Sequence, residues 1–188
     1  MAKIEKELQS VILAMSSKEK DKLLLRLIAK DRVLLERLRF ELLEESSTIE
    51  ERREEIRKAI DHLYQTPVYS SGYLMMDIRS VNALITHHVK ITKDKYGEVE
   101  LTLRLLNDCF EKQLKWIERY SSKTDKLASY VAKRTDFVLN KLTKLHPDIQ
   151  FEFEEIMNTL LQRVHEFAPS YYARDLQIRK KFEIEYIE

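Results

Sequence analysis

"EVELTLRLLNDCFEKQLKWIERY", residues 98–120, carries apolar side chains around more than half of the circumference of a helix. These apolar residues are Leu101, Leu103, Leu105, Leu106, Cys109, Phe110, Leu114, Trp116, Ile117 and Tyr120. A helix that is apolar on so many sides packs against neighbours on two or three of them. We therefore expect this helix at the centre of the fold, with Cys109 as a buried small hydrophobic residue rather than a reactive thiol.

The composition of the whole chain predicts an all-α protein. Only 2 glycines and 3 prolines occur among 188 residues, whereas tight β-hairpins depend on residues that take positive φ. Charged residues make up 35% and hydrophobic residues 44% of the chain, a balance typical of a folded globular protein. Because the length suits one ordinary domain, we expect a single all-helical domain over residues 1–188.

Caps and breakers along the chain predict about nine helices joined by short connections. Their expected ranges are about 3–14, 18–30, 32–45, 48–66, 73–92, 98–120, 124–145, 148–167 and a last helix from 170. Gly72 is expected in a break before the fifth helix, and Gly97 in the turn after it, free to take the left-handed conformation. Short connections favour antiparallel neighbours, arranged either as an irregular α-α stack or as a helical bundle.

Within the last seven residues, 182–188, Phe182, Ile184 and Tyr186 alternate with Glu183 and Glu185. A period of two is typical of extended chain. We therefore expect either an extended tail that docks on a partner or a frayed final helical turn.

The stretch "KLLLRLIAKDRVLLERLRFELLEE", residues 22–45, combines an apolar helix, a tight turn at Asp31 and a second helix that carries arginine. Over residues 17–45 this pattern resembles a single HEAT-type helical repeat. In that family, repeats stack into curved solenoids that bind other macromolecules, so the resemblance implies a HEAT-like stack with a binding role. The later helices are longer and irregularly spaced, which departs from the family's repeat of roughly 40 residues.

Three polar residues fall on the apolar sides of expected helices. Asp77 and His88 do so on the fifth helix and Arg134 on the seventh. Because a charge inside a protein needs a partner, we expect a buried polar cluster of these residues, with an ion pair between Asp77 and Arg134. The adjacent His87 and His88 lie about 100° apart around a helix, which excludes them as a joint metal-ligand pair.

The sequence contains no motif for catalysis or for a cofactor. None of the five histidines pair at the HxxxH or HExxH spacing that binds zinc. Two isolated glycines cannot build a phosphate-binding loop or a dinucleotide fingerprint. We expect no catalytic residue, no metal and no cofactor, so an enzyme is the less favoured class.

The net charge, the single cysteine and the lengths of the apolar runs bear on the cellular location of the protein. The formal net charge is +1 and there is one cysteine, which fits a reducing compartment. No apolar run approaches the roughly 20 residues that a bilayer requires. We expect a cytoplasmic protein with no membrane association.

Positive charge is concentrated in the middle of the chain. Residues 73–146 hold 14 basic and 9 acidic side chains, whereas residues 147–188 hold 5 basic and 9 acidic ones. The basic side chains that form rows on the sixth and seventh expected helices, beside Tyr130, are Lys112, Lys115, Arg119, Lys126, Lys133 and Lys144. Such a face can track a phosphate backbone, unless the acidic last helices pack over it.

Two functions of different classes follow from these features. The leading expectation is a non-catalytic scaffold or adaptor that binds another protein through a helix surface, with a homo-oligomer as one form of that association. The alternative is nucleic-acid binding through the basic face of the helices at about 98–120 and 124–145.

Overall fold

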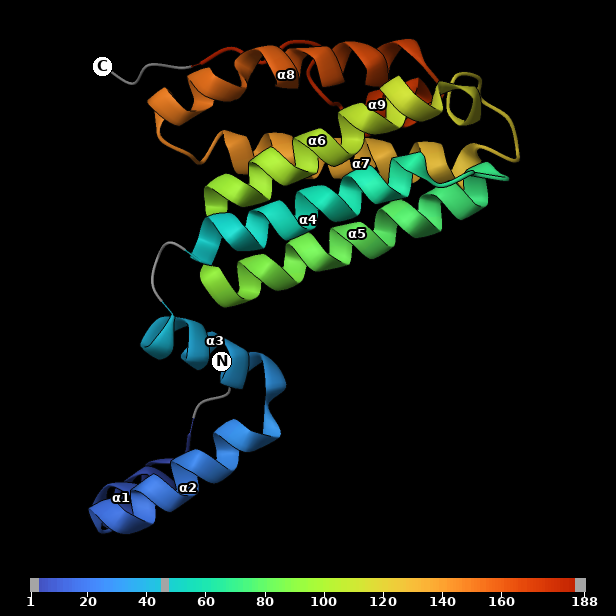
Figure 1. Cartoon of the computed structure of the whole chain (residues 1–188). Coiled ribbons are helices and arrows are strands. Elements are labelled where there is room, and N and C mark those ends of the chain that lie inside the picture. The colour runs from blue at the N-terminus through green and yellow to red at the C-terminus, as the bar shows by residue number, and fades with distance from the viewer. Residues whose placement is uncertain (1–3, 45–47, 185–188) are drawn as a thin grey trace. The chain divides into compact units, whose positions relative to one another are not determined.

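The computed structural model of the protein describes residues 4–44 and 48–184 (Figure 1). Within these residues the regular structure is entirely helical, with nine α-helices and no strand, which confirms the all-α fold class. The chain divides into two compact units, residues 1–45 and 46–188, and this differs from the single domain expected over residues 1–188. The reason is that the three N-terminal helices bury no side chain, whereas the hydrophobic core draws its buried residues from the second unit.

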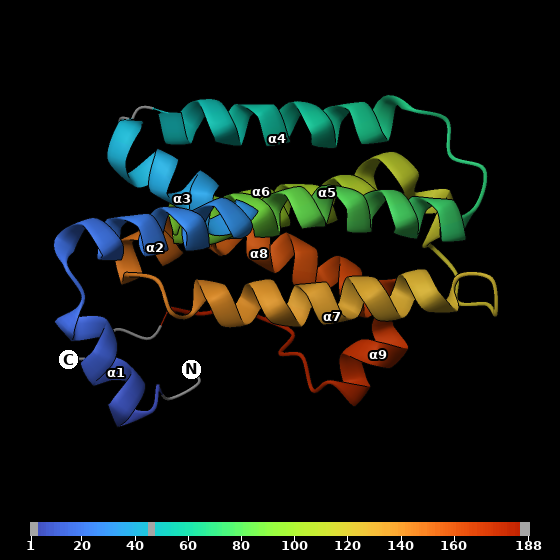
Figure 2. The same ribbon diagram turned by 90° about the horizontal axis from the view of Figure 1, so that it is seen from below.

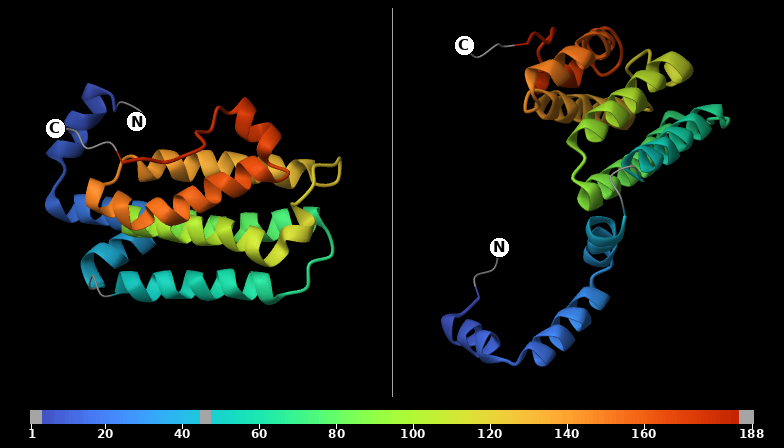
Figure 3. Two further views of the ribbon diagram at one scale, coloured as in Figure 1. Left: turned by 90° about the horizontal axis from the view of Figure 1, so that it is seen from above. Right: turned by 60° about the vertical axis from the view of Figure 1, so that its left-hand side comes forward.

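The first unit contains α1 (Lys6–Ala14), α2 (Ser17–Lys30) and α3 (Arg32–Leu43) (Figure 3, right). Ser16 and Glu19 form a capping box at the start of α2, since each side chain accepts the backbone N–H of the other residue. Asp31 caps α3 by accepting the N–H of Leu34 at 3.0 Å. Helices α2 and α3 contact each other next to the turn at Asp31. The HEAT-type character of residues 17–45 stays a prediction.

The second unit contains six α-helices within residues 48–184. They are α4 (Thr48–Gln65), α5 (Ser71–Thr92), α6 (Lys95–Gln113), α7 (Asp125–Leu142), α8 (Pro147–Glu166) and α9 (Ser170–Asp175). Figure 2 shows α4, α5 and α7 with their axes roughly aligned. No helix in the two described ranges is long and apolar enough to cross a membrane.

Helix α6 lies at the centre of the second unit, as predicted. It packs against α4, α5, α7 and α8, and the four leucines between positions 101 and 106 are at most 1% exposed. The helix is shorter than the expected 98–120, because it ends at Gln113 and a 3₁₀ turn, Leu114–Trp116, follows. That turn carries Ile117 into the core, where its carbonyl accepts the N–H of Ala168 at 3.1 Å.

Both glycines lie inside helices, which corrects the expectation that they mark breaks. Gly72 belongs to α5 and Gly97 to α6, and neither has a positive φ. The left-handed residue at the end of α5 is Lys93, with φ of 60°. Gly97 has a different role, which follows from its contacts with Asp94.

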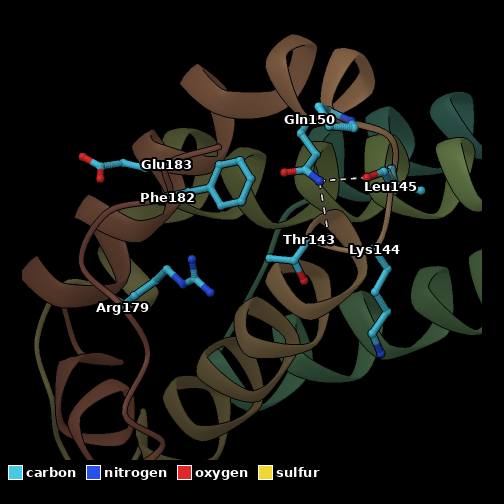
Figure 4. Close-up of a pocket in the computed structure, with 8 residues that line it drawn as sticks. Thr143, Lys144, Leu145, Gln150, Arg179, Phe182 and Glu183 are labelled. Carbon is cyan, nitrogen blue, oxygen red and sulfur yellow. Dashed lines mark hydrogen bonds between the residues drawn. The ribbon is translucent and has the colours of Figure 1, made fainter. Parts of the chain in front are cut away.

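The C-terminal segment is extended up to residue 184 and packs on its own chain (Figure 3, left). The side chain of Asn158 pairs with the backbone of Phe182: its Oδ1 accepts the N–H at 2.7 Å, and its Nδ2 donates to the carbonyl at 3.0 Å. Phe182 is 1% exposed, and Figure 4 shows its ring turned toward Gln150 of α8. Residues 182–184 thus lie outside any helix and pack against α8 of their own chain, and the docking of the tail on a partner stays a prediction. Residues 185–188 of the expected tail lie outside the described residues.

Candidate functional site

The structure does not bring the predicted cluster of Asp77, His88 and Arg134 together. The buried face of α5 carries Leu74, Ile78, Val81, Ile85 and His88. Asp77 immediately precedes Ile78, so it is turned about 100° away from this face, and it is exposed. The predicted ion pair between Asp77 and Arg134 is therefore wrong.

His88 is buried as expected, and it pairs with Asp94, which in turn pairs with Arg53. Its Nε2 lies 2.9 Å from Asp94 Oδ2. Asp94 also accepts from Arg53 Nε and Nη2, each at 2.7 Å. The side chains of the three residues are 3%, 5% and 17% exposed in the order His88, Asp94, Arg53. We call this arrangement the His88–Asp94–Arg53 cluster; it joins α4, α5 and the start of α6.

Hydrogen bonds determine the charge state of Asp94. Burial alone would raise the pKa of this carboxyl. Hydrogen bonds from His88, from Arg53 and from the backbone N–H of Gly97 outweigh burial and hold the pKa of Asp94 well below its usual range. Asp94 is thus a buried carboxylate with a charged partner, the condition under which a buried charge is tolerated.

Gly97 provides the space that the cluster occupies. Asp94 caps α6 by accepting the N–H of Gly97 at Oδ1, 2.9 Å away. A Cβ at position 97 would lie 2.1 Å from Asp94 Oδ2 and 2.8 Å from Arg53 Nε. The absence of a side chain at Gly97, rather than freedom in φ, therefore allows the guanidinium and the cap to share one carboxylate.

This cluster is built to hold helices together. Both oxygens of Asp94 are engaged, and the remaining ring nitrogen of His88, Nδ1, is buried without a hydrogen-bond partner. Two further arginine–carboxylate contacts continue the seam between α4 and α6: Arg57 to Glu100 at 2.8 and 2.9 Å, and Arg104 to Asp61 at 2.8 Å. An enclosed His–Asp pair of this kind has no access for a substrate.

The described residues also offer no arrangement suited to a metal. No group of three or more His, Cys, Asp or Glu side chains within 4–44 and 48–184 is placed to hold an ion. Cys109 is fully buried, and burial raises the pKa of its thiol to about 12. A thiol in this state is not a nucleophile at neutral pH.

The predicted basic residues lie in several different surroundings. Lys112 pairs with Asp108 at 2.7 Å, and Lys115 lies over the Trp116 ring at 5.1 Å from its centroid. Lys144 lies at the end of α7 in a pocket beside the C-terminal segment (Figure 4).

The other predicted basic residues are more open. Arg119, Lys126 and Lys133 are exposed and make no ion pair with a described residue. Tyr130 is half-buried beside Arg134, in a groove between α5 and α7. The structure therefore leaves Lys126 and Lys133 as the open part of the predicted basic row.

The largest feature that the sequence did not reveal is the exposed apolar surface of the first unit. Its exposed large hydrophobic residues are Ile4, Leu8, Val11, Leu13, Leu24, Leu25, Leu27, Val33, Leu35, Leu42 and Leu43. We call these eleven side chains the N-terminal apolar surface. The sequence correctly predicts these helices, but it does not specify what covers their apolar side chains.

The geometry thus offers an enclosed structural cluster, a dispersed set of lysines and a large apolar surface. Comparison with known proteins adds no family to this description: no family model, no curated protein and no solved structure matches the chain.

Proposed function

We propose that this protein is a non-catalytic helical adaptor that associates with a second copy of itself through the N-terminal apolar surface. The observation that carries the proposal is the absence of any buried residue in α1, α2 and α3, although ten of the eleven large apolar side chains lie on these helices and Ile4 lies just before them. In this proposal, the second unit, which contains the hydrophobic core, takes no part in the self-association and stays available to other molecules in each copy.

The short length of these helices supports the proposal. They contain 9, 14 and 12 residues, and isolated helices shorter than about 12–15 residues are marginal in water. Helical stability in proteins comes mostly from packing of an apolar face against another element. Helices without a core of their own gain that stability when a partner covers the face.

The size and charge of the surface favour a second copy. A stable interface buries about 800 Å² on each partner, and eleven large apolar side chains supply an area of that order. Residues 4–44 hold nine basic and eight acidic side chains, so two copies of this region do not repel each other strongly. An anionic partner would instead be matched by a clear basic excess.

Light scattering coupled to size exclusion, over a concentration series of the full chain, tests this association. We expect a mass of at least two chains that falls to one chain in the double variant Leu24→Lys with Leu27→Lys. These leucines lie one helical turn apart on α2 and are 56% and 53% exposed. Leu84→Lys is the matched control, because Leu84 is a 48% exposed leucine of the second unit. A wild-type mass of one chain at every concentration, or a mass unchanged in the double variant, contradicts the proposal.

The alternative function is nucleic-acid binding, and the support for it comes from Lys126 and Lys133. Both are exposed on α7 without an ion pair to a described residue. Retardation of a random oligonucleotide at low salt should then weaken steeply as salt rises. The double variant Lys126→Glu with Lys133→Glu should abolish it, and the absence of retardation at low salt would exclude this function.

A further inference from the structure

A groove between α5 and α7 gathers cations without gathering carboxylates. Arg79, Asn82, Thr86 and Lys90 of α5 line it, opposite Tyr130 and Arg134 of α7. The α5 residues follow one another at intervals of three, four and four, which places them on one face of the helix. The groove has a volume of about 500 Å³, within the range of about 300–1,000 Å³ typical of small-molecule sites.

Three cations of this groove form no ion pair with a described residue. Arg79, Lys90 and Arg134 make no ion pair there, although other partly buried arginines do. Arg53, Arg57, Arg104 and Arg163 each contact a carboxylate within 3 Å. Arg134 is therefore unusual in this fold: it is half-buried and lacks a carboxylate partner.

The surroundings of Arg134 show how it is held. Its guanidinium lies 3.9 Å from the centroid of the Phe137 ring, and its Nε is buried without a hydrogen-bond partner. Burial lowers the pKa of Arg134, and the nearby charge of Glu98 offsets this effect only in part. Glu98 is itself paired with Lys141 at 2.8 Å. A partly desolvated cation without a partner costs folding free energy, and a bound anion would remove that cost.

Tyr130 lines the groove together with Arg79 and Arg134. Burial raises the pKa of its hydroxyl, whereas the charges of Arg134 and Arg79 act in the opposite direction. Two arginines beside a hydroxyl supply the forked donors that bind phosphate oxygens in pairs.

We propose that the groove between α5 and α7 binds a phosphate group, held by Arg79, Tyr130 and Arg134. Asn82 and Thr86 supply further polar contacts, and Lys90 lies about 16 Å along α5 from Arg79 at a rise of 1.5 Å per residue. The groove is larger than one phosphate requires, so it has room for an organic group attached to the phosphate. Asn82 Oδ1 is buried without a partner, and exchanging the oxygen and nitrogen of this amide would instead present a donor.

This proposal goes beyond the adaptor function and does not depend on it, since all the lining residues lie in the second unit. Two kinds of ligand carry a phosphate group: free inorganic phosphate and a phosphorylated small molecule. Two probes separate them: inorganic phosphate and adenosine monophosphate. Each is titrated into the full chain by calorimetry, with sodium chloride at matched ionic strength as the blank.

We expect saturable binding of at least one probe. Tighter binding of adenosine monophosphate indicates a phosphorylated small molecule, whereas equal affinities indicate phosphate alone. Arg79→Ala should weaken binding roughly tenfold or more, the loss expected for one charge-assisted pair. Lys58→Ala is the matched control, because Lys58 is an exposed cation of α4 outside the groove, and it should bind as the wild type does.

Arg134→Met provides an independent measurement. A side chain of similar length without charge should abolish binding while the melting temperature stays the same or rises. The proposal is overturned if neither probe binds at concentrations of about 10 mM, or if Arg79→Ala and Lys58→Ala lose affinity equally. Binding of a short single-stranded DNA, with neither small probe binding, also overturns it and favours nucleic acid instead.

Discussion

Replacing Gly97 with alanine should destabilise the protein, although the same change within a helix is normally favourable. Alanine is favoured over glycine in a helix interior by about 1 kcal/mol. Gly97 lies in the first turn of α6, and its backbone N–H is bound by the cap Asp94. The added Cβ would lie 2.1 Å from Asp94 Oδ2, a distance that no relaxation of bond angles can absorb. The carboxylate must therefore move away, and Arg53 and His88 lose their partner.

The size of the loss follows from those contacts. Losing an N-cap costs about 1 kcal/mol, and breaking a buried ion pair by displacing one partner costs about 3 kcal/mol at the lower end of the measured range. The lower end applies because Arg53 also lies 3.3 Å from Glu50 and keeps that contact. After the gain of about 1 kcal/mol from helix propensity, a net loss of about 3 kcal/mol remains. For a protein of this size, that loss corresponds to a fall in melting temperature of roughly 9 °C.

Urea denaturation followed by circular dichroism measures this loss, and the chain provides its own control. Gly72 also lies in the first turn of a helix, but a Cβ there would meet Ser70 Oγ at an ordinary 3.6 Å. Gly72→Ala should therefore leave stability unchanged or raise it by at most about 1 kcal/mol. In an Asp94→Ala background, Gly97→Ala should cost almost nothing, because the group it displaces has gone. Equal effects of Gly97→Ala in both backgrounds would refute the steric argument.

Three further outcomes are expected from the same structure. The folded-state pKa of Asp94 lies below its unfolded value of about 3.9, so the stabilisation that Asp94 provides is fully present above that pH and is lost as the pH falls. The free energy of unfolding in urea should therefore fall less steeply with acid in Asp94→Asn than in the wild type. Cys109, whose pKa burial raises to about 12, should react with a thiol reagent at pH 8 only as fast as the protein unfolds, and rapid labelling of native protein would contradict its burial. Phe182→Ala should lower the free energy of unfolding by about 3 kcal/mol, whereas Asn158→Ala, which leaves the buried ring in place, should cost about 1–2 kcal/mol; hydrogen exchange should locate both losses at the C-terminal segment.

The local part of this fold could be predicted from the sequence. Ser16 and Asp31 each bond to a backbone N–H within three residues, so their capping signal lies within one turn of chain. The broad apolar coverage of residues 98–120 likewise predicted the central position of α6. Such features depend on periodicity and on neighbours in sequence, and both are visible without a structure.

The long-range part could not be predicted, because it depends on details of register. Arg53 and Asp94 are 41 residues apart, and nothing in either local sequence specifies the pairing. Asp77 failed as a site residue because one step along a helix rotates a side chain by about 100°, which separates it from the buried position 78. The sequence did contain a signal for the role of Gly97. This glycine follows the capping Asp94 by three residues, where the absence of a Cβ leaves room for the carboxylate.

Two of the partly buried arginines of the second unit, Arg53 and Arg134, show most clearly how a residue kept for folding differs from one kept for function. Arg53 has a bidentate carboxylate partner in Asp94, and a cation in that state contributes to the joint between helices. Arg134 is enclosed to a similar degree but has an aromatic ring on one side and an open groove on the other. An uncharged side chain would suit its position at least as well for folding, because methionine would need no counterion. The charge at position 134 is thus best explained by a contact outside the fold, and a phosphate group is the partner that the surrounding donors fit.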